Sequence, residues 1–286
     1  MENLIEVKGL SKSYPSFDLQ SLSFTMPAGS IMGLIGQNGS GKTTTIKLLL
    51  NLIRRGQGTI KILGLDSVQE EMKIKDQIGI VLDEPPFPGR LTLKQIAYIV
   101  SGHYSRWNQR EFSSCVERFA LPLDKKFEAL STGTKAKFSL AIALSHGAKL
   151  LILDEPTAGL DPIVREEILS MLFEVVEQED QGVLFSSHIT SDLEKVADYI
   201  TFIHDGRLVF QSTKDALMEQ YRIVKGPRKD LPRLKGKIYS YREVPFGFEA
   251  LTTDAEAIRK LNHQAFHIER ATIDDIMLYH IKGELL

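Results

Sequence analysis

The chain has 286 residues, a formal net charge of −2 at pH 7 and 43% hydrophobic residues. This length and composition are typical of one large globular domain, or of one domain followed by a smaller one. Because the net charge is close to zero, the protein has no overall positive field that would attract it to nucleic acid. Because Cys115 is the only cysteine, no intramolecular disulfide is possible, which fits a reducing compartment.

We expect no signal peptide, because Met1 to Leu4 lack a basic segment followed by an apolar core. No apolar run approaches the roughly 20 residues that span a bilayer. The chain is therefore expected to be soluble by itself and to reach a membrane only through a partner. Cys115 lies in a helical pattern, and we expect it to be buried rather than nucleophilic because no neighbour would lower the pKa of its thiol.

The first predicted elements are strands that lead to a phosphate-binding loop. Apolar residues predict antiparallel strands over residues 5–10 and 22–24, and a buried strand over Ile31–Ile35. A glycine-rich loop follows and precedes a helical run, Ile46–Leu50. Such a loop points its backbone N–H groups at phosphates. The nucleotide-binding residues expected from it are Gly36, Asn38, Gly39, Ser40, Gly41, Lys42, Thr43 and Thr44.

Two side chains of this loop carry specific expectations. Lys42 is expected to reach the β- and γ-phosphates of a nucleotide, and the Thr43 hydroxyl to ligate magnesium. The alternative is a glycine-rich turn that carries a lysine by chance. The strand before the loop and the helix after it favour phosphate binding.

From there to the C-terminal part, predicted strands alternate with predicted helices, which indicates a doubly wound α/β core. Leu150–Leu153 is a continuous apolar run, as expected of a parallel strand covered on both faces. Three prolines forbid regular structure between Asp83 and Gly89. Strands are expected over 59–63, 78–82, 150–153, 183–186, 199–203 and 208–210. Helices are expected over 134–145 and 163–177, and residues 91–120 are expected to form two helices separated near Trp107.

Two carboxylates end the apolar run at 150–153. Asp154 can hold magnesium at the tip of the strand, and Glu155 can polarise a water that attacks a γ-phosphate. Adjacent acids after a strand are more often a solvated turn, but the phosphate loop favours the functional interpretation. Ser131 precedes the helix at 134–145, where a plain N-cap and a phosphate contact explain it equally well.

Taken together, five motifs occur in one order. They are the phosphate loop, Leu130-Ser131-Thr132-Gly133, Asp154-Glu155 after its strand, Ala158-Gly159-Leu160-Asp161, and Ser187-His188. With this combination, the chain from about Leu4 to Tyr221 strongly resembles the ATP-binding subunit of an ATP-binding cassette (ABC) transporter. The resemblance implies a P-loop NTPase fold of the α/β class, with a parallel-sheet core, an antiparallel β subdomain and a helical subdomain at about 88–146. The ATP-binding domain would span residues 1–221.

The resemblance also implies roles for single residues. Tyr14 would stack on adenine, and His188 would contact the γ-phosphate. Lys42, Glu155 and His188 would form the catalytic group. Magnesium would be held by Thr43, Asp154 and Asp83. The residues that would contact the nucleotide of the opposite subunit across a dimer are Ser131, Gly133 and Asp161.

Several positions depart from the usual family pattern. Asp83 stands where glutamine is common, and it adds negative charge beside Asp154 and Glu155. Thr132 stands where glycine is common, and Lys137, where arginine is common, cannot make the same bidentate contact. Thr134 also departs, because glutamine or methionine is usual there. These departures are compatible with slow turnover but not with a dead site.

Residues 222–286 are predicted to form a linker and a small C-terminal α+β module. Basic residues cluster around Gly226-Pro227, where we place the linker. A hairpin about Pro245-Phe246-Gly247, a helix over 255–261 and a last helix over 273–281 are expected after it.

By this resemblance, two subunits would close on two ATP molecules with Mg²⁺, and hydrolysis would loosen the pair. The motion would drive export through a separate membrane permease, so the chain would act at the cytoplasmic face of the membrane. The second subunit would be identical or related. Phe87 and Leu91 are candidate permease contacts, although packing under a loop explains them equally well. Bacterial exporter ATPases have this layout, and amphipathic or antimicrobial peptides, including phenol-soluble modulins, are the favoured cargo.

Two other classes of protein remain open from the sequence. A soluble cassette that acts on nucleic acid or ribosomes would use the basic linker and Tyr239 and Tyr241, but such proteins carry two cassettes or long coiled coils, so no nucleic acid is expected. A regulatory protein that binds ATP without hydrolysing it is the other alternative.

Overall fold

The computed structural model describes residues 3–177, 181–261 and 266–286, so Met1 and Glu2, on which the signal-peptide expectation partly rests, lie outside it. The chain forms two compact units, Met1–Gln211 and Ser212–Leu286. The division lies earlier in the chain than the expected one after Tyr221. Helix α8 (Lys214–Gln220), which the sequence did not predict, is therefore grouped with the C-terminal unit.

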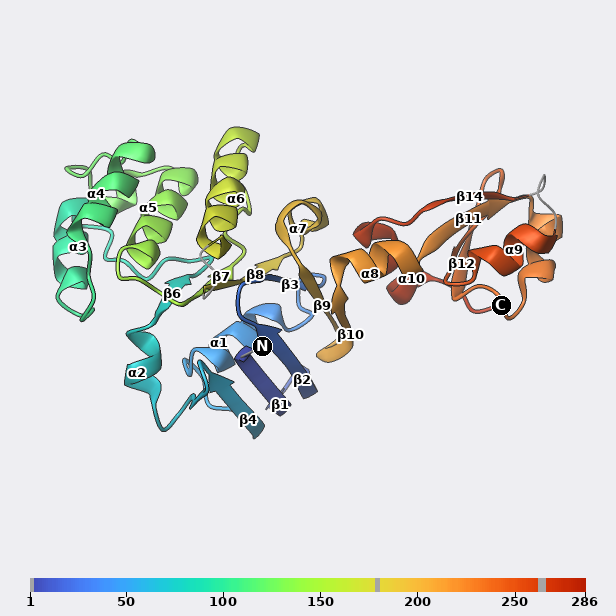
Figure 1. The fold of residues 1–286 in the computed structure, drawn as a ribbon, viewed down its shortest axis with the longest axis horizontal. Coiled ribbons are helices and arrows are strands. Elements are labelled where there is room, and N and C mark those ends of the chain that lie inside the picture. The colour runs from blue at the N-terminus through green and yellow to red at the C-terminus, as the bar shows by residue number, and fades with distance from the viewer. Residues whose placement is uncertain (1–2, 178–180, 262–265) are drawn as a thin grey trace. The chain divides into compact units, whose positions relative to one another are not determined.

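A six-stranded sheet with a parallel core forms the centre of the first unit (Figure 1). Its strand order is β10-β9-β3-β8-β7-β6, and β3 pairs in parallel with both β8 and β9. Every residue of β3, β7 and β8 is buried, which explains their continuous apolar character. The bounds are β3 (Ile31–Ile35), β6 (Ile78–Val81), β7 (Leu150–Asp154), β8 (Gly182–Ser187), β9 (Tyr199–His204) and β10 (Arg207–Thr213).

An antiparallel sheet of order β2-β1-β4-β5 completes the β structure of this unit. The β1–β2 hairpin turns at Pro15 and Ser16, and Val7 of β1 pairs with Phe24 on one side and Ile60 on the other. Both hairpin strands are longer than predicted. The bounds are β1 (Asn3–Tyr14), β2 (Phe17–Pro27), β4 (Gln57–Ile62) and β5 (Leu65–Asp66).

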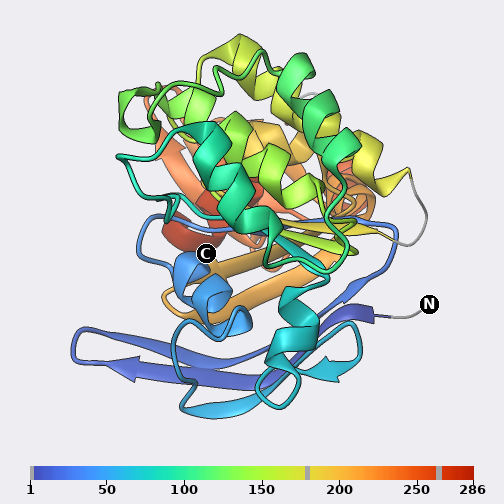
Figure 2. The same ribbon diagram turned by 90° about the vertical axis from the view of Figure 1, so that its left-hand side faces the viewer.

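Helix α1 (Lys42–Leu49) lies between the two sheets, as Figure 2 shows. It begins four residues before the predicted helical run, directly after Gly41. Its apolar side chains share one core with residues of both sheets. Members of this core include Val7, Ile60, Leu34, Ile152, Ile46 and Leu49. Since all six are at most 1% exposed, the helix that follows the phosphate loop is held rigidly from both sides.

The opposite face of the central sheet is covered by helices, drawn green to yellow in Figure 2. Side-chain caps start most of them: Thr92 with a capping box, Asn108, Ser131 and Asp161. Cys115 is 3% exposed, which confirms its predicted burial. The bounds are α3 (Leu93–Ser101), α4 (Gln109–Arg118), η1 (Phe127–Ala129), α5 (Thr132–Leu144), α6 (Pro162–Val176) and a short unpredicted helix, α7 (Thr190–Val196). A second short unpredicted helix, α2 (Glu71–Lys75), lies on the α1 side instead, where its Ile74 joins the core shared with the antiparallel sheet.

The C-terminal unit is a four-stranded antiparallel sheet of order β12-β13-β11-β14 with helices packed against it. The predicted hairpin and the two predicted helices are confirmed. The prediction of a linker directly after Tyr221 is corrected, because β11 (Arg222–Gly226) is an inner strand whose Val224 is fully buried. The other bounds are η2 (Arg228–Leu234), β12 (Ser240–Val244), β13 (Gly247–Thr252), α9 (Ala255–Leu261), β14 (His267–Arg270) and α10 (Ile273–Lys282).

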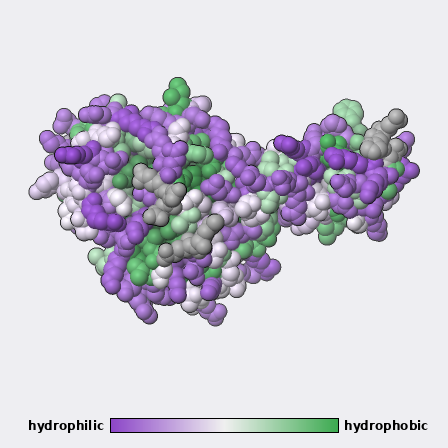
Figure 3. Space-filling view, in the orientation of Figure 1, coloured by the Kyte–Doolittle hydropathy of each residue, from purple (hydrophilic) through white to green (hydrophobic). Residues whose placement is uncertain are grey.

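Among the described residues, no helix is long and apolar enough to cross a membrane. On the face in view in Figure 3, hydrophilic side chains coat most of each unit. Apolar patches also reach this face of the first unit, while the large apolar side chains of the two cores are buried.

Candidate nucleotide-binding site

The predicted phosphate loop connects β3 to α1. Its last glycine, Gly41, has φ 113° and precedes Lys42, the first residue of the helix. A Cβ atom at Gly41 would lie 2.9 Å from Leu19 and 3.0 Å from Phe17, both in β2. Only glycine fits this close approach in a left-handed conformation. The Ser40 hydroxyl is buried without a hydrogen-bond partner among the described residues.

Lys42 is the cation at the centre of the site. It is only 5% exposed, and its Nζ donates to the Gly36 carbonyl at 2.9 Å. The same Nζ lies 3.2 Å from Oε1 of Glu155. A buried ammonium requires such partners, because burial of an unpaired charge is costly. Lys42 is therefore held where it can exchange one oxygen partner for another.

Glu155 and His188 meet at the ends of neighbouring strands β7 and β8. Glu155 Oε2 lies 2.7 Å from His188 Nδ1 and accepts the His188 backbone N–H at 3.3 Å. Glu155 has φ 51°, a conformation that non-glycine residues rarely adopt. Such strain persists only where the surrounding structure enforces it, and it is concentrated at functional sites.

Asp154 is the last residue of β7 and is 2% exposed. Its Oδ1 accepts hydrogen bonds from Ser186 Oγ at 2.6 Å and from Thr43 Oγ1 at 3.4 Å. Asp83 is a third carboxylate of the site. Burial, and then the charges of Asp154 and Glu155, raise the pKa of Asp83 above its usual value.

These oxygens fit a hard cation such as Mg²⁺, which takes one or two carboxylates together with substrate phosphates. Thr43, Asp154 and Asp83 are the predicted ligands. The residues that the structure describes contain no cluster of three or more side chains that would hold a metal ion alone.

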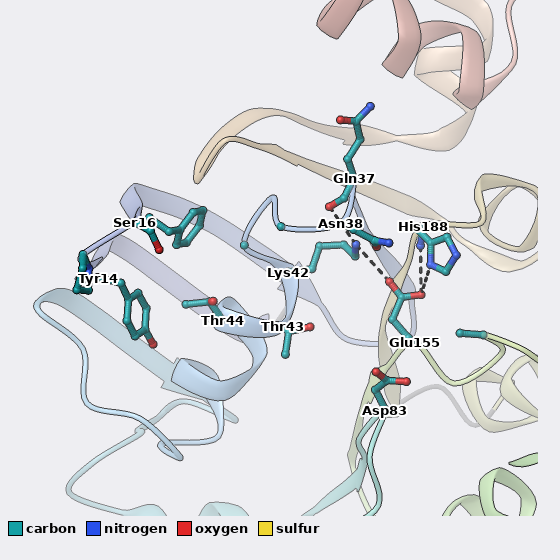
Figure 4. A pocket seen from close by; sticks show the side chains of 15 residues that line it. Tyr14, Ser16, Gln37, Asn38, Lys42, Thr43, Thr44, Asp83, Glu155 and His188 are labelled. Atoms are coloured by element: carbon teal, nitrogen blue, oxygen red, sulfur yellow. Dashed lines mark hydrogen bonds and ion pairs between the residues drawn. The ribbon is translucent and has the colours of Figure 1, made fainter.

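A cavity of about 840 Å³ opens over these groups (Figure 4). Its volume suits a ligand the size of a nucleotide. In the close-up, Lys42 and His188 point toward Glu155, with Asp83 nearby. The lining residues are Tyr14, Pro15, Ser16, Phe17, Gln37, Asn38, Gly39, Gly41, Lys42, Thr43, Thr44, Asp83, Glu155, Ala158 and His188.

Tyr14 lies at the end of the cavity that is remote from Glu155, beside Thr44 (Figure 4). Tyr14 is 39% exposed, and Lys12 Nζ lies 5.4 Å from the centroid of its ring. Phe17 also lines the cavity, although the sequence did not single it out. Phe17 lies between the two predicted strands, 5–10 and 22–24, so the strand pattern did not indicate that it faces the phosphate loop.

Six of the predicted site residues do not line this cavity: Gly36, Ser40, Ser131, Gly133, Asp154 and Asp161. Gly36 and Ser40 belong to the phosphate loop and Asp154 ends β7, whereas the other three lie at the starts of α5 and α6. Ser131 caps α5 by accepting Thr134 N–H at 3.2 Å, and Asp161 caps α6 through Ile163 and Val164 N–H, both at 3.1 Å. Gly133 lies close to α6, since a Cβ there would be 3.5 Å from a Val164 methyl group. The two predicted motifs are therefore neighbours on α5 and α6.

The departures from the family pattern near α5 have structural partners. Lys137 Nζ lies 2.6 Å from Glu167 Oε2, and its side chain is 15% exposed. The Thr134 hydroxyl lies 2.8 Å from the Ser131 hydroxyl. Both residues are thus engaged within this chain.

The site combines a phosphate loop and its buried lysine with an aspartate, a glutamate and a histidine at neighbouring strand ends. This combination defines a P-loop nucleotide hydrolase.

The family model described as ABC transporter matches residues 19–158. ABC transporter ATP-binding protein YtrB of Bacillus subtilis is 33% identical over 76% of this chain and 75% of its own length. Bacitracin transport ATP-binding protein BcrA of Bacillus licheniformis is 32% identical over 78% and 74%, respectively.

A solved structure of an ATP-binding subunit of an ABC transporter superposes with a TM-score of 0.69 at 28% identity. The match covers 76% of this chain and 92% of that one. The chain belongs to the ABC transporter family and is an ATP-binding subunit with an ABC-type ATPase fold. The predicted family and fold class are confirmed.

Proposed function

We propose that this chain hydrolyses ATP with Mg²⁺ at the described cavity and thereby drives export through a separate membrane permease. The observation that carries the proposal is the convergence of Lys42, Glu155 and His188 at one end of a cavity walled by the phosphate loop. Tyr14 at the other end is available to stack on the base. A nucleoside triphosphate lying along the cavity would place its base at Tyr14 and its γ-phosphate near Lys42, Glu155 and His188.

In this mechanism, the loop N–H groups and Lys42 bind the β- and γ-phosphates. Lys42 then exchanges its contact with Glu155 for phosphate oxygens, which frees the Glu155 carboxylate to orient the attacking water. His188 donates a hydrogen bond to the γ-phosphate. Thr43, Asp154 and Asp83 would hold Mg²⁺, whose charge neutralises the phosphate oxygens when it is bound.

A second copy of the chain, or a related subunit, completes the site. Ser131, Gly133 and Asp161 lie outside the cavity of their own chain, at the N-termini of α5 and α6. The positive ends of helix dipoles favour phosphate, so these termini suit the nucleotide of a facing subunit. Loss of the γ-phosphate on hydrolysis removes a bridge between the two subunits, which then loosen.

The permease contact is assigned to a groove of about 570 Å³ on α3 and α4. Leu91 lines it together with Tyr98 and Ile99, which are 82% and 49% exposed. Phe87 instead packs edge-on against Phe127 and Phe138, at 5.4 and 5.5 Å between ring centroids. Of the two predicted contacts, we therefore keep Leu91 and assign Phe87 to packing. A short permease helix fits such a groove.

The proposed cargo is an amphipathic or antimicrobial peptide, and the proposed location is the cytoplasmic face of the membrane, through the permease. The similarity to a subunit named for bacitracin transport supports this choice. A nucleic-acid partner is not proposed, because the basic cluster after Tyr221 is partly neutralised within its own sheet. Lys225, for example, lies 3.2 Å from Glu249 and 2.8 Å from Glu269.

The test compares ATP hydrolysis and nucleotide-dependent dimerisation of the wild type and Glu155→Gln. We expect the variant to bind ATP, to form a stable dimer and to hydrolyse at least about 100-fold more slowly. Glu219→Gln, at an exposed acid outside the cavity, is the matched control and should hydrolyse at the wild-type rate. Hydrolysis by Glu155→Gln at the wild-type rate would refute the proposal, and equal, negligible rates for both would indicate a protein that only binds ATP.

A further inference from the structure

A buried carboxylate outside the cavity links segments of the first unit that carry proposed site residues. Asp192, on α7, is 1% exposed. Its Oδ2 accepts a hydrogen bond from Thr157 Oγ1 at 2.7 Å, and its Oδ1 accepts one from Arg165 Nε at 2.5 Å. Arg165 also donates to Ser191 Oγ at 3.1 Å through Nη2. Both carboxylate oxygens are therefore engaged.

The three linked residues come from different segments, each next to a proposed site residue. Thr157 lies two positions after Glu155, and Asp192 lies in the helix that starts just after His188. Arg165 belongs to the first turn of α6, where its N–H donates to the carbonyl of the capping residue Asp161 at 3.0 Å. None of the linked residues lines the cavity.

This geometry constrains the Glu155 segment in particular. Glu155 is held at φ 51°, so its position depends on how firmly the following residues are anchored. Thr157, 1% exposed, anchors them to α7 through its hydroxyl. Because a buried carboxylate cannot lose a partner without a large desolvation penalty, this anchor has little freedom to shift.

We propose that Asp192 is a positioning residue that, through Thr157 and Arg165, sets the relative placement of Glu155, His188 and Asp161. It controls turnover without contacting the nucleotide. The inference rests on the proposed role of Glu155 in hydrolysis. Since small displacements of a catalytic group lower rates strongly, loss of the linkage should act on kcat and leave ATP affinity in place.

The sharpest test uses a matched pair at position 157. Thr157→Val keeps the shape of the side chain but removes the hydroxyl, whereas Thr157→Ser keeps the hydroxyl. We expect Thr157→Val to lower kcat at least about tenfold, with the Kd for a fluorescent ATP analogue within about twofold of wild type, and Thr157→Ser to stay close to wild type. Asp192→Asn, which removes the charge that Arg165 requires, should show the same split between kcat and Kd.

Two results would overturn the inference. One is a wild-type kcat for Thr157→Val and Asp192→Asn. The other is that kcat, ATP affinity and melting temperature fall together in Thr157→Val and Asp192→Asn, and fall in Thr157→Ser as well. That result would indicate a purely structural role. If Thr157→Val does not fold, Asp192→Asn and Arg165→Lys provide the test, and each should lower kcat without changing the Kd for the ATP analogue. Glu155→Gln measured in parallel separates the two proposals, because an inactive Glu155→Gln beside a fully active Thr157→Val defeats only this inference.

Discussion

Ser186 Oγ donates a hydrogen bond to Asp154 Oδ1 at 2.6 Å and accepts the backbone N–H of Glu155 at 3.0 Å. One hydroxyl on β8 thus holds both acids at the end of β7. Ser186 is fully buried, so water cannot replace either bond if the hydroxyl is removed.

Ser186→Ala is therefore expected to reduce both stability and turnover. The free energy of unfolding should fall by about 1–3 kcal/mol, because a buried carboxylate oxygen loses a donor. Urea unfolding and steady-state ATP hydrolysis measure the two effects. Ser139→Ala is the matched control, since this buried hydroxyl donates only to a carbonyl of its own helix, at 2.9 Å. Equal turnover of both variants would contradict the expectation.

Tyr14→Ala should weaken ATP binding by about 1–3 kcal/mol, which is the typical value of stacking between a base and an aromatic ring. Tyr14→Phe keeps the ring and should bind ATP like the wild type. Calorimetric titration of both variants with ATP measures the difference. An equal loss of affinity in Tyr14→Phe would show that the hydroxyl, rather than the ring, contacts the nucleotide.

Asp83→Asn should raise the melting temperature of the nucleotide-free protein at neutral pH. The pKa of Asp83 is raised above 3.8, first by burial and then by Asp154 and Glu155. Because the pKa of Asp83 is higher in the folded than in the unfolded protein, its ionised form lowers the free energy of unfolding. This cost is absent below the unfolded-state pKa and is complete once the pH has risen through the folded-state pKa. The gain of the variant should therefore disappear as pH approaches 3.8. Melting curves over this pH range in EDTA test it, and a gain that does not change with pH would count against it.

Gly206→Ala should destabilise the protein more than Gly64→Ala. Both glycines have positive φ, 70° and 76°, but a Cβ at Gly206 would lie 1.9 Å from the Asp18 carbonyl oxygen, whereas nothing lies within 4 Å of one at Gly64. Urea titration should give a free energy of unfolding that is about 1–3 kcal/mol lower for Gly206→Ala than for Gly64→Ala. Because both sites have positive φ, this difference isolates the steric contact. Because Gly206 N–H donates to the Ser40 carbonyl at 2.9 Å, its variant should also bind ATP more weakly. Equal destabilisation by both substitutions would refute the contact.

Cys115 should resist thiol reagents in the native protein. Burial raises the pKa of its thiol to about 11, so only on the order of 0.1% is thiolate at pH 8. Absorbance assays with an aromatic disulfide should show slow labelling of the native protein and rapid, stoichiometric labelling after unfolding in urea. Fast labelling of the native state would show that α4 opens locally.

The phosphate loop and the strand-end acids were predictable because each has a local pattern: glycines before Lys42, and an apolar run before Asp154. Ser186 and Asp192 had no such pattern. Their importance depends on partners far along the chain, which a single sequence does not pair. Phe17 was missed for the same reason, since its contact with Gly41 exists only in the folded hairpin.

The elements that the sequence missed are short or mixed in composition. Helices α2, α7 and α8 have five to seven residues, too few for helical periodicity or for stability without tertiary contacts. Strand β11 carries Lys225 beside two apolar residues, so it resembles a basic linker. Its place in the sheet becomes evident only with the carboxylates of the flanking strands, Glu249 and Glu269, which pair with that lysine.

The order of strands in the central sheet has a consequence for synthesis on the ribosome. Strand β3, with all five residues buried, pairs only with β8 and β9, which are translated long after it. The phosphate loop therefore emerges attached to an apolar strand whose neighbours do not yet exist. Until His204 has left the exit tunnel, the nascent chain exposes this strand to chaperones and to aggregation, and it cannot assemble a nucleotide pocket.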